Sequence, residues 1–277
     1  MRLFMSTFSL IIATLGRKRE LVRLLESLIP QSVSLQVVLV DQNPPGYLSD
    51  ILQPFLNKLP ITQLNVPSKG VSVARNIGLT QATGDFIAFP DDDCWYAPDT
   101  LTCVLELFRA NPSCGALLGV WTASPETPAH KITEGIVSRT DLFRLAGTCV
   151  QFYRKEAVAG IQFDPLLGPG TGLPYGCGED TDYLLHVHAL TEVRRYKKIR
   201  VFHPAPETNL PSSEKVASYA AGRIYLLKKH NFPLWFVFAN ILFPLAALPL
   251  GTLKHGRGWA NYRWQMFKAR LRAWSCG

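Results

Sequence analysis

Apolar and polar positions alternate in blocks along the first 110 residues. Short apolar runs predict buried strands, and apolar residues at i, i+3, i+4 and i+7 predict amphipathic helices. The first strand is expected over 8–14. The next helix is expected to carry Leu21, Leu24, Leu25 and Leu28. Further strands are expected at 35–40, 61–66 and 84–89, and further helices at 48–59, 71–81 and around 101–108.

This alternation of strands and helices with short connections predicts an α/β fold. The central sheet is expected to be mostly parallel, with helices on both of its faces. Ligands of such sheets bind beyond the carboxyl ends of the strands. Thr14, Asp41 and Asp91–Asp93 each follow a predicted strand, so we expect a polar, acidic binding edge there.

The stretch from 111 to 214 is less regular. Strands are expected at 150–153 and 161–163, and glycine at five of the eleven positions of 168–178 predicts a flexible loop. No Gly-Lys-Ser/Thr follows these glycines, so the loop is not of the Walker type. Glu179 then opens a predicted helix, where acidic residues are favourable.

The segment 232–251 carries no charged residue over 20 positions, which is enough to cross a bilayer. Three prolines within it and cations at both ends predict a kinked or re-entrant hairpin at least as well as a straight span. A helix over 259–274 follows, with an aromatic stripe bordered by Lys and Arg. Such a helix is typical of an anionic membrane surface.

Charge divides the chain into two parts. From Lys215 onward there are ten Lys or Arg and no acidic residue, which leaves 19 basic and 21 acidic residues in 1–214. This segregation favours an anionic membrane over nucleic acid as partner. We therefore predict a catalytic domain over 1–214, with halves 1–110 and 111–214, and a membrane-associating segment over 215–277.

Six cysteines without C-x-x-C spacing predict reduced thiols rather than a disulfide framework or a zinc site. The apolar run 3–15 has the composition of a signal-peptide core. No A-x-A site follows it, and Arg17 to Arg19 lie on the wrong side, so a strand is the better interpretation. Met1 and Met5 are both candidate starts.

Asp91–Asp93 crowd three carboxylates at one strand end. Hard oxygen ligands in a tight cluster suit Mg²⁺ or Mn²⁺, and Mg²⁺ completes its shell with water and substrate phosphates. The triplet therefore predicts a metal and a diphosphate partner. The structural alternative is an acidic helix start, with Asp93 or Asp99 as the cap.

Five segments, taken together, resemble the family 2 glycosyltransferases of the GT-A fold. In chain order they are "FSLIIATLGR", "VVLVDQN", "GVSVARNIGL", "ATGDFIAFPDDD" and "GEDTDYLL", spanning residues 8 to about 190. The resemblance implies an enzyme that transfers a sugar, with inversion, from a nucleotide-diphosphate donor.

The resemblance also implies roles on the donor side. Thr14 and Asp41 are expected to hold the base and ribose, and Asp92 is assigned to the same binding site. Lys69 and Arg75 are expected to meet the diphosphate. Asn76 and Ser72 share one helical face with Arg75, whose structural alternative is a salt bridge that orders the loop.

For the metal, Asp91 and Asp93 resemble the ends of the D-x-D motif, and Asp93 is the expected direct ligand. His203 is a candidate third ligand or, equally, a structural histidine. Inverting transfer needs a base on the acceptor side of the sugar. Asp180 is the expected base and Glu179 the second candidate; a simple acidic N-cap is the alternative.

Two features depart from the family pattern: "VDQN" replaces a V-D-D-G-S-like turn, and Cys94-Trp95 directly follow the triplet. The donor is expected to be a UDP-, GDP- or dTDP-sugar. The acceptor is expected to be a saccharide or lipid-linked saccharide of cell-surface polysaccharide or glycolipid assembly. The expected location is the cytoplasmic face of the plasma membrane.

Two other functions are open at this point. A sugar nucleotidyltransferase would need a glycine-rich turn after the first strand, and the single Gly16 there disfavours it. A non-catalytic membrane or nucleic-acid adaptor would use the basic tail. It leaves Asp91–Asp93 and Glu179-Asp180 unexplained.

Overall fold

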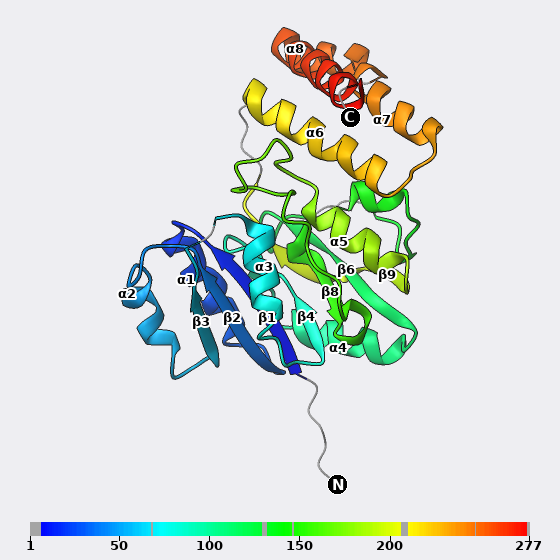
Figure 1. Ribbon diagram of the computed structural model, residues 1–277. Helices are drawn as coiled ribbons and strands as arrows, with labels where there is room; N and C mark the ends of the chain where they lie inside the picture. The colour runs from blue at the N-terminus through cyan, green and yellow to red at the C-terminus, as the bar shows by residue number, and fades with distance from the viewer. Residues whose placement is uncertain are drawn as a thin grey trace.

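The computed structural model describes residues 7–67, 69–128, 132–145, 147–205, 210–246 and 248–275. They form one mixed sheet with helices on both faces, and three C-terminal helices lie beyond the edge at which β1 and β2 end (Figure 1). The strands are β1 (Thr7–Thr14), β2 (Ser34–Asp41), β3 (Ile61–Asn65), β4 (Phe86–Ala88), β5 (Trp95–Tyr96), β6 (Cys114–Thr122), β7 (Gly135–Ile136), β8 (Gln151–Arg154) and β9 (Glu192–Phe202). The helices are α1 (Lys18–Leu28), α2 (Ser49–Leu52), α3 (Val71–Leu79), α4 (Thr100–Ala110), α5 (Glu179–His188), α6 (Ser213–Lys229), α7 (Leu234–Ala246) and α8 (Leu248–Ser275).

The strand order is β3-β2-β1-β4-β8-β6-β9-β5, with β7 paired to β9. Strands β3, β2, β1 and β4 are parallel, whereas β8 runs antiparallel to both β4 and β6. Over the described strands, four pairs are parallel and four antiparallel. The expectation of a mostly parallel sheet is therefore right for the first half and wrong for the second. A parallel neighbour is usually reached through a crossover helix, whereas the described residues between β6 and β8 form the short strand β7 and two 3-10 turns, with no α-helix among them.

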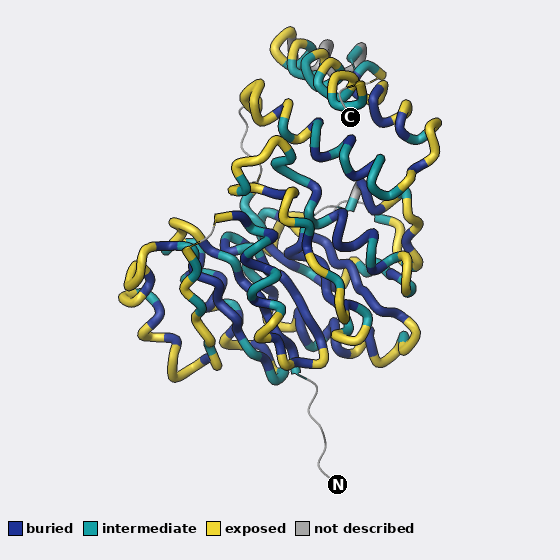
Figure 2. Tube along the Cα trace, in the orientation of Figure 1, coloured by how far each residue is buried: buried dark blue, intermediate teal, exposed yellow. Residues whose placement is uncertain are grey.

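Alternate side chains of β1 build two cores, one on each face of the sheet. Phe8, Leu10 and Ile12 join the core that packs against α1 and α4. Ile11 points the other way, into the core shared with α3, α5 and α6. The strands are accordingly buried in the centre of the molecule, as Figure 2 shows.

Two predicted elements differ in the structure. The helix expected over 48–59 ends at Leu52, and Pro54 lies in the 3-10 turn Gln53–Phe55 that follows. The strand expected at 161–163 does not form. Asn76 instead holds Phe163 by two hydrogen bonds of 2.8 Å, one to its N–H and one to its C=O, and these replace a sheet ladder.

The apolar segment 232–251 is bent. Helix α7 ends at Ala246 and α8 begins at Leu248, so the segment is divided between two helices. The 13 residues of α7 extend about 20 Å, which is short of the hydrocarbon thickness of about 30 Å. No helix in the described part of the chain combines the length and apolar character that crossing a membrane requires. The straight span that was open at the sequence level is not found.

Candidate active site

Three aspartates follow β4 at the edge where β1 also ends. Thr14, the last residue of β1, donates a hydrogen bond of 2.9 Å to Asp92 Oδ2. Arg17 Nη1 lies 3.0 Å from Asp92 Oδ1 and 2.5 Å from Asp93 Oδ2. The positive charge expected at the triplet is thus partly supplied by the chain itself. Arg17 was not assigned from the sequence, although a basic residue directly after the first strand was a usable signal.

Burial is the largest influence on the pKa of Asp92. Desolvation raises the pKa of Asp92 to about 6, against Arg17 and Thr14, which lower it. Asp92 is 7 % exposed and both of its oxygens are bonded within the chain. It therefore orders Thr14 and Arg17 around the triplet, and its predicted role in donor binding stays a prediction.

Asp93 and His203 come together from distant parts of the chain. His203 follows β9, and its Nε2 lies 3.2 Å from Asp93 Oδ1. That oxygen is buried and has no well-aligned hydrogen bond from the described residues. The carboxylate of Asp93 raises the pKa of His203. Burial opposes ionisation of Asp93, but His203 and Arg17 outweigh it and lower the pKa of Asp93.

Arg75 links Asp91 to the first turn of α5. It is 3 % exposed, and its Nη2 donates to Asp91 Oδ1 at 2.8 Å and to Thr148 Oγ1 at 2.7 Å. Its Nη1 lies 3.4 Å from Glu179 Oε1. Arg75 thus forms the salt bridge that was the structural alternative for it. It ties the donor edge of the sheet to the acidic pair on α5.

The acidic pair at the start of α5 has two different environments. Asp180 Oδ2 accepts from the Gly147 N–H at 2.7 Å, and its Oδ1 accepts from the Thr181 N–H at 2.6 Å. Burial and the neighbouring Asp180 charge raise the pKa of Glu179 to about 7. Asp180 is fixed in place by backbone donors, whereas Glu179 is a partly buried acid, with its side chain 12% exposed, beside Arg75.

The raised pKa of Glu179 predicts a pH-dependent stability. Between 4.5 and about 7 the folded chain binds more protons at Glu179 than the unfolded chain, so wild-type stability falls as pH rises through this window. Glu179→Gln cannot ionise. Its stability relative to wild type is expected to rise by on the order of 2 kcal/mol between pH 5 and pH 8 in urea melts. Glu156→Gln, at a 72 % exposed glutamate, is the matched control, and its stability relative to wild type should not change with pH. If Glu179→Gln changes the free energy of unfolding by the same amount at pH 5 and pH 8, the prediction is wrong.

The glycine-rich loop packs closely on this acidic pair. Gly168 has φ +101°, and a Cβ there would lie 2.9 Å from Val71 and 3.1 Å from the Glu179 carboxyl. The Val71 N–H also donates to the carbonyl of Pro169 at 3.2 Å. A glycine at 168 therefore lets the loop close over the start of α3 and over Glu179.

The donor-side residues at the end of β2 are arranged differently from the expectation. Asp41 is fully buried, and its oxygens accept four hydrogen bonds of 2.7–3.1 Å from the N–H and side chain of Asn43 and from Gln63 and Asn65. A base N–H could reach Asp41 only if one of these amides moved. Asp41 thus positions Asn43, Gln63 and Asn65, which the sequence reasoning missed.

The other residues that were expected near the diphosphate of the sugar donor are either exposed or bonded to the chain itself. Lys69 is exposed beside this edge. Asn76 uses both ends of its amide on the Phe163 main chain, so its observed role is to hold that segment. Ser72 likewise donates to the carbonyl of Leu167 at 2.7 Å. The face of α3 that was expected to meet the diphosphate is thus largely occupied by the chain, apart from Arg75.

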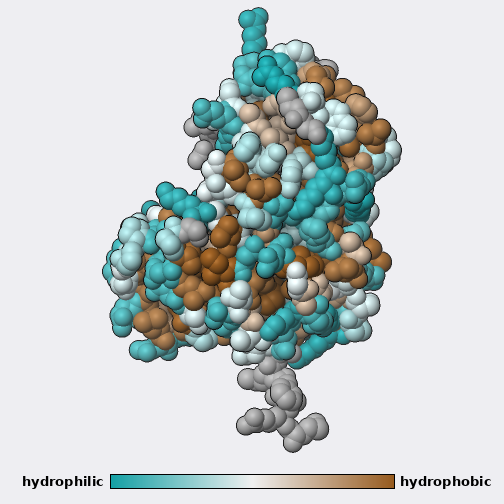
Figure 3. Space-filling view, in the orientation of Figure 1, coloured by the Kyte–Doolittle hydropathy of each residue, from teal (hydrophilic) through white to brown (hydrophobic). Residues whose placement is uncertain are grey.

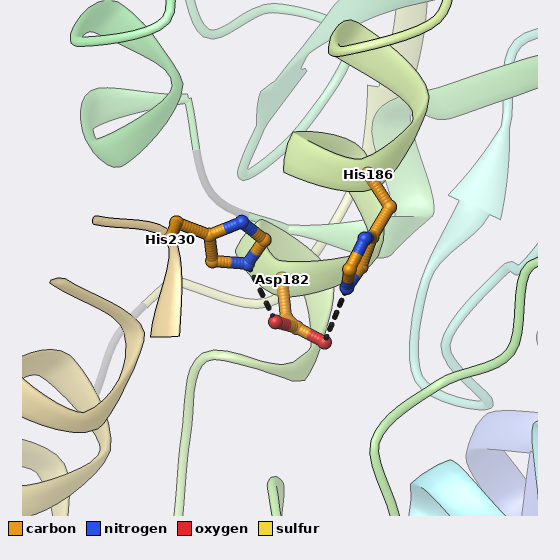
Figure 4. Close-up of side chains that lie close together, drawn as sticks. All are labelled: Asp182, His186 and His230. Atoms are coloured by element: carbon orange, nitrogen blue, oxygen red, sulfur yellow. Dashed lines mark hydrogen bonds and ion pairs between the residues drawn. The ribbon is translucent and has the colours of Figure 1, made fainter. Parts of the chain in front are cut away.

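The described residues contain one group of three side chains that bring possible metal-ligating atoms within 4.8 Å of one another: Asp182, His186 and His230. The predicted set of Asp91, Asp93 and His203 is not gathered as tightly. Figure 4 shows Asp182 between the two histidines, 2.7 Å from His230 Nε2 and 3.8 Å from His186 Nε2.

The ammonium group of Lys229 already neutralises the cluster of Asp182, His186 and His230. Lys229 Nζ lies 2.9 Å from Asp182 Oδ2 and 2.7 Å from Asp164 Oδ2. Its ammonium group would repel a metal ion, so an ion-pair network explains the cluster. The network joins α5, two residues after Asp180, to the end of α6.

The mixed sheet, with the acidic triplet and the start of α5 beyond one edge, is an α/β fold of the GT-A type. The structure is similar to Staphylococcus aureus TarS 1–349 in complex with UDP-GlcNAc, with a TM-score of 0.65 and 18% identity, over 97% of this chain and 90% of that one. It is also similar to the mannosyltransferase PcManGT from Pyrobaculum calidifontis in complex with GDP-Man and Mn²⁺, with a TM-score of 0.66 and 15% identity, over 99% and 87%.

The family model for glycosyl transferase family 2 matches residues 9–155, and the chain belongs to this family. The succinoglycan biosynthesis protein ExoM of Rhizobium meliloti is 28% identical over 207 residues, 69% of this chain and 65% of that protein. The minor teichoic acid biosynthesis protein GgaB of Bacillus subtilis is 28% identical over 171 residues, 57% of this chain and 19% of that protein. The chain thus matches less than two thirds of the length of these relatives. Membership decides for the glycosyltransferase over the nucleotidyltransferase and adaptor alternatives.

Proposed function

We propose that this glycosyltransferase moves a sugar, with inversion and with the help of a divalent cation, from a nucleotide-diphosphate donor to a lipid-linked saccharide. The observation that carries the proposal is the bridge made by Arg75 between Asp91 and Glu179, 2.8 Å and 3.4 Å away. It couples the acidic edge of the sheet to the acidic pair on α5. A donor at one end and an acceptor at the other would meet between them.

The side chains at the triplet fit Mg²⁺ or Mn²⁺. Asp93 Oδ1 is buried with no hydrogen-bond partner among the described residues, and His203 Nε2 lies 3.2 Å from it. Both ions accept a carboxylate oxygen, and Mn²⁺ also accepts an imidazole nitrogen, so a site that includes His203 favours Mn²⁺. Asp91 Oδ1 is already bonded to Arg75 and Thr148, so a ligand role of Asp91 falls to Oδ2. When bound, the cation would offset negative charge on the departing diphosphate.

The chain itself would supply orientation and the proton acceptor. Arg17 and Thr14 hold Asp92 and Asp93 in place at the donor edge. The backbone donors of Gly147 and Thr181 fix the Asp180 carboxylate at 2.7 Å and 2.6 Å. Oδ1 also accepts from the Thr181 hydroxyl at 3.2 Å, whereas Oδ2 accepts only from Gly147 among the described residues. Asp180 would therefore use Oδ2 to accept the proton of the acceptor hydroxyl as the hydroxyl oxygen attacks the anomeric carbon.

A membrane partner is supported by the exposed face of α7. Five large apolar residues share this face and are 46–66% exposed: Leu234, Trp235, Phe238, Leu242 and Phe243. Hydrophobic surface gathers over the C-terminal helices in Figure 3. Apolar patches of this kind mark membrane or protein contact sites. Beside it, α8 exposes Arg257, Lys268 and Arg272, which complement anionic lipid. We propose docking of α7 at the cytoplasmic face of the plasma membrane.

Glutamate substitutions on this face should abolish docking. The triple variant Trp235→Glu, Phe238→Glu and Phe243→Glu is expected to reduce sedimentation with phosphatidylglycerol vesicles by 100-fold or more, since each buried aromatic ring contributes about 2 kcal/mol. The control carries glutamate at Ile136 and Leu190, which are 66% and 72% exposed outside α7. Equal vesicle binding by both variants would place the membrane contact elsewhere.

A donor screen tests the transferase proposal. Purified protein with Mn²⁺ would be mixed with UDP-, GDP- and dTDP-sugars, and nucleotide release would be measured with and without a lipid-linked saccharide fraction. One nucleotide class should be turned over, and chelation of the metal should stop the turnover. Metal-independent release from every donor, or none from any, would overturn the proposal.

A further inference from the structure

Three arginines meet where α6, α7 and α8 pack together. Arg223 lies on α6, and Arg263 and Arg270 lie on α8. The segment from Lys215 onward contains no acidic residue, and no carboxylate of the described residues forms an ion pair with any of the three. Removing guanidinium groups from water without a counter-charge is unfavourable. The packing therefore needs a physical explanation.

Asn240, a buried polar residue of α7, brings two of these arginines together. Arg223 Nε donates to Asn240 Oδ1 at 3.1 Å, and Arg270 Nη1 donates to the Asn240 main-chain oxygen. That carbonyl is available because Pro244, four residues later, has no N–H to continue the helix ladder. The proline within the apolar segment thus directs Arg270 toward Arg223.

The unused donors of the cluster lie on Arg263 and Arg270, because Arg223 also donates from Nη1 and Nη2 to the Phe143 carbonyl at 3.3 Å and 3.4 Å. The Nε atoms of Arg263 and Arg270 are buried and have no hydrogen-bond partner in the described part of the chain. Arg263 makes ring contacts, including one with Trp259 at 4.6 Å. Burial and the charge of Arg270 lower the pKa of Arg223 to about 10, and burial lowers the pKa of Arg270. An anion would relieve both the repulsion and the missing hydrogen bonds.

The position of the cluster indicates which anion. A Cβ at Gly222, the neighbour of Arg223 on α6, would overlap the carbonyl oxygen of Cys177, so the cluster lies close to the first turn of α5. On the other side, the Arg263 guanidinium lies 5.9 Å from the ring of Phe243, which is 58% exposed on the apolar face of α7. The arginines therefore separate the proposed base from the proposed membrane contact.

We propose that Arg223, Arg263 and Arg270 bind the diphosphate group that joins the acceptor saccharide to its lipid. The inference rests on the proposed function, whose acceptor class it specifies. Planar guanidinium groups match phosphate oxygens in bidentate geometry. The lipid chain would then follow the apolar face of α7, and the saccharide would extend toward Asp180.

Farnesyl diphosphate is a soluble probe of this site. Its binding to the full chain would be followed by isothermal titration calorimetry in chelator, which keeps the diphosphate from binding through a metal at the donor site. Arg263→Gln and Arg270→Gln are expected to weaken binding by roughly 10-fold each, the typical loss of a charge-assisted hydrogen bond. Arg109→Gln is the control, because Arg109 is exposed on α4, outside the C-terminal helices, and this variant should bind as wild type.

Three further ligands show whether the diphosphate, the lipid chain or any anionic headgroup provides the binding. Farnesol, which lacks phosphate, should bind at least 10-fold more weakly, and inorganic pyrophosphate should compete with farnesyl diphosphate. Phosphatidylglycerol in micelles should not compete, because its phosphodiester carries less charge. Equal loss in Arg109→Gln would reduce the effect to nonspecific charge, and competition by phosphatidylglycerol would reduce the cluster to a general lipid contact; either result would overturn the proposal.

The donor screen keeps the two proposals distinguishable. Wild-type protein that releases nucleotide from a sugar donor but does not bind farnesyl diphosphate would retain the transferase and reject the phosphate site. Protein that binds the probe without donor turnover would reject the transferase reaction instead. Circular dichroism melts of Arg263→Gln and Arg270→Gln check that lost binding is not lost folding.

Discussion

Replacing Asp93 by asparagine is expected to reduce metal-stimulated sugar transfer by on the order of 10³-fold, because a catalytic cation contributes several kcal/mol. Asp93 offers a buried Oδ1 that lacks a hydrogen bond from the described residues and faces His203 at 3.2 Å. The amide keeps the shape of the side chain but removes its charge. Arg17, the other partner, has a side chain that is 50% exposed and can be hydrated, so the fold should survive.

The measurements are Mn²⁺ binding by electron paramagnetic resonance and donor turnover. Asp99→Asn is the matched control, since Asp99 is exposed six residues later and makes no side-chain cap to α4. His203→Ala should also weaken Mn²⁺ binding. Full metal stimulation in folded Asp93→Asn would refute the assignment of the metal to this edge.

The polar residues at the carboxyl ends of the strands could be predicted from the sequence, because short apolar runs directly before them determine where the strands end. The apolar run before Asp91–Asp93 forms β4, and Thr14 and Asp41 end β1 and β2 opposite each other in register. The spacing of apolar residues and the order of the strands are thus enough to predict that these polar groups lie at one edge of the sheet. The start of α5 at Glu179 follows from the same local signals.

The partners of these groups could not be predicted, because they are distant in sequence. Arg17 reaches Asp92 across 75 positions, and Arg75 reaches Glu179 across 104. For a carboxylate at a strand end, the sequence does not tell whether its oxygens are free or bonded. This is why Asp41 was expected to meet a nucleotide, whereas four protein donors surround it.

Strand β6 in the second half of the sheet was missed for a related reason, although β8 was expected at 150–153 and forms at Gln151–Arg154. β6 spans Cys114–Thr122 and is buried along nearly its whole length, so it shows no polar alternation. Gly119 also interrupts the apolar pattern of β6. Glycine is required at this position, because a Cβ there would lie 2.6 Å from the side chain of Ile199 on β9. Such close strand packing is a tertiary property. The glycine that permits it weakens the local strand signal.

Asp180→Asn is expected to lower the rate of transfer by roughly 10²–10⁴-fold, the range of general-base catalysis, with little change in donor affinity. The effect should be on kcat, because the acceptor hydroxyl would keep its proton while the donor edge is unchanged. Glu179→Gln separates the two acids. It removes the partly buried acid beside Arg75 but leaves Asp180 and its two backbone donors, so its loss of kcat should be much smaller.

The geometry of Asp180 makes a second variant necessary. Both of its oxygens accept backbone hydrogen bonds, from Gly147 at 2.7 Å and Thr181 at 2.6 Å. In Asp180→Asn the amide NH₂ must face one of these N–H groups, which costs about 1–3 kcal/mol of local stability. Asp180→Ser removes the base without that repulsion, so the two variants should lose kcat alike. If donor binding collapses in both, or if Glu179→Gln loses more kcat than either, the base is not Asp180.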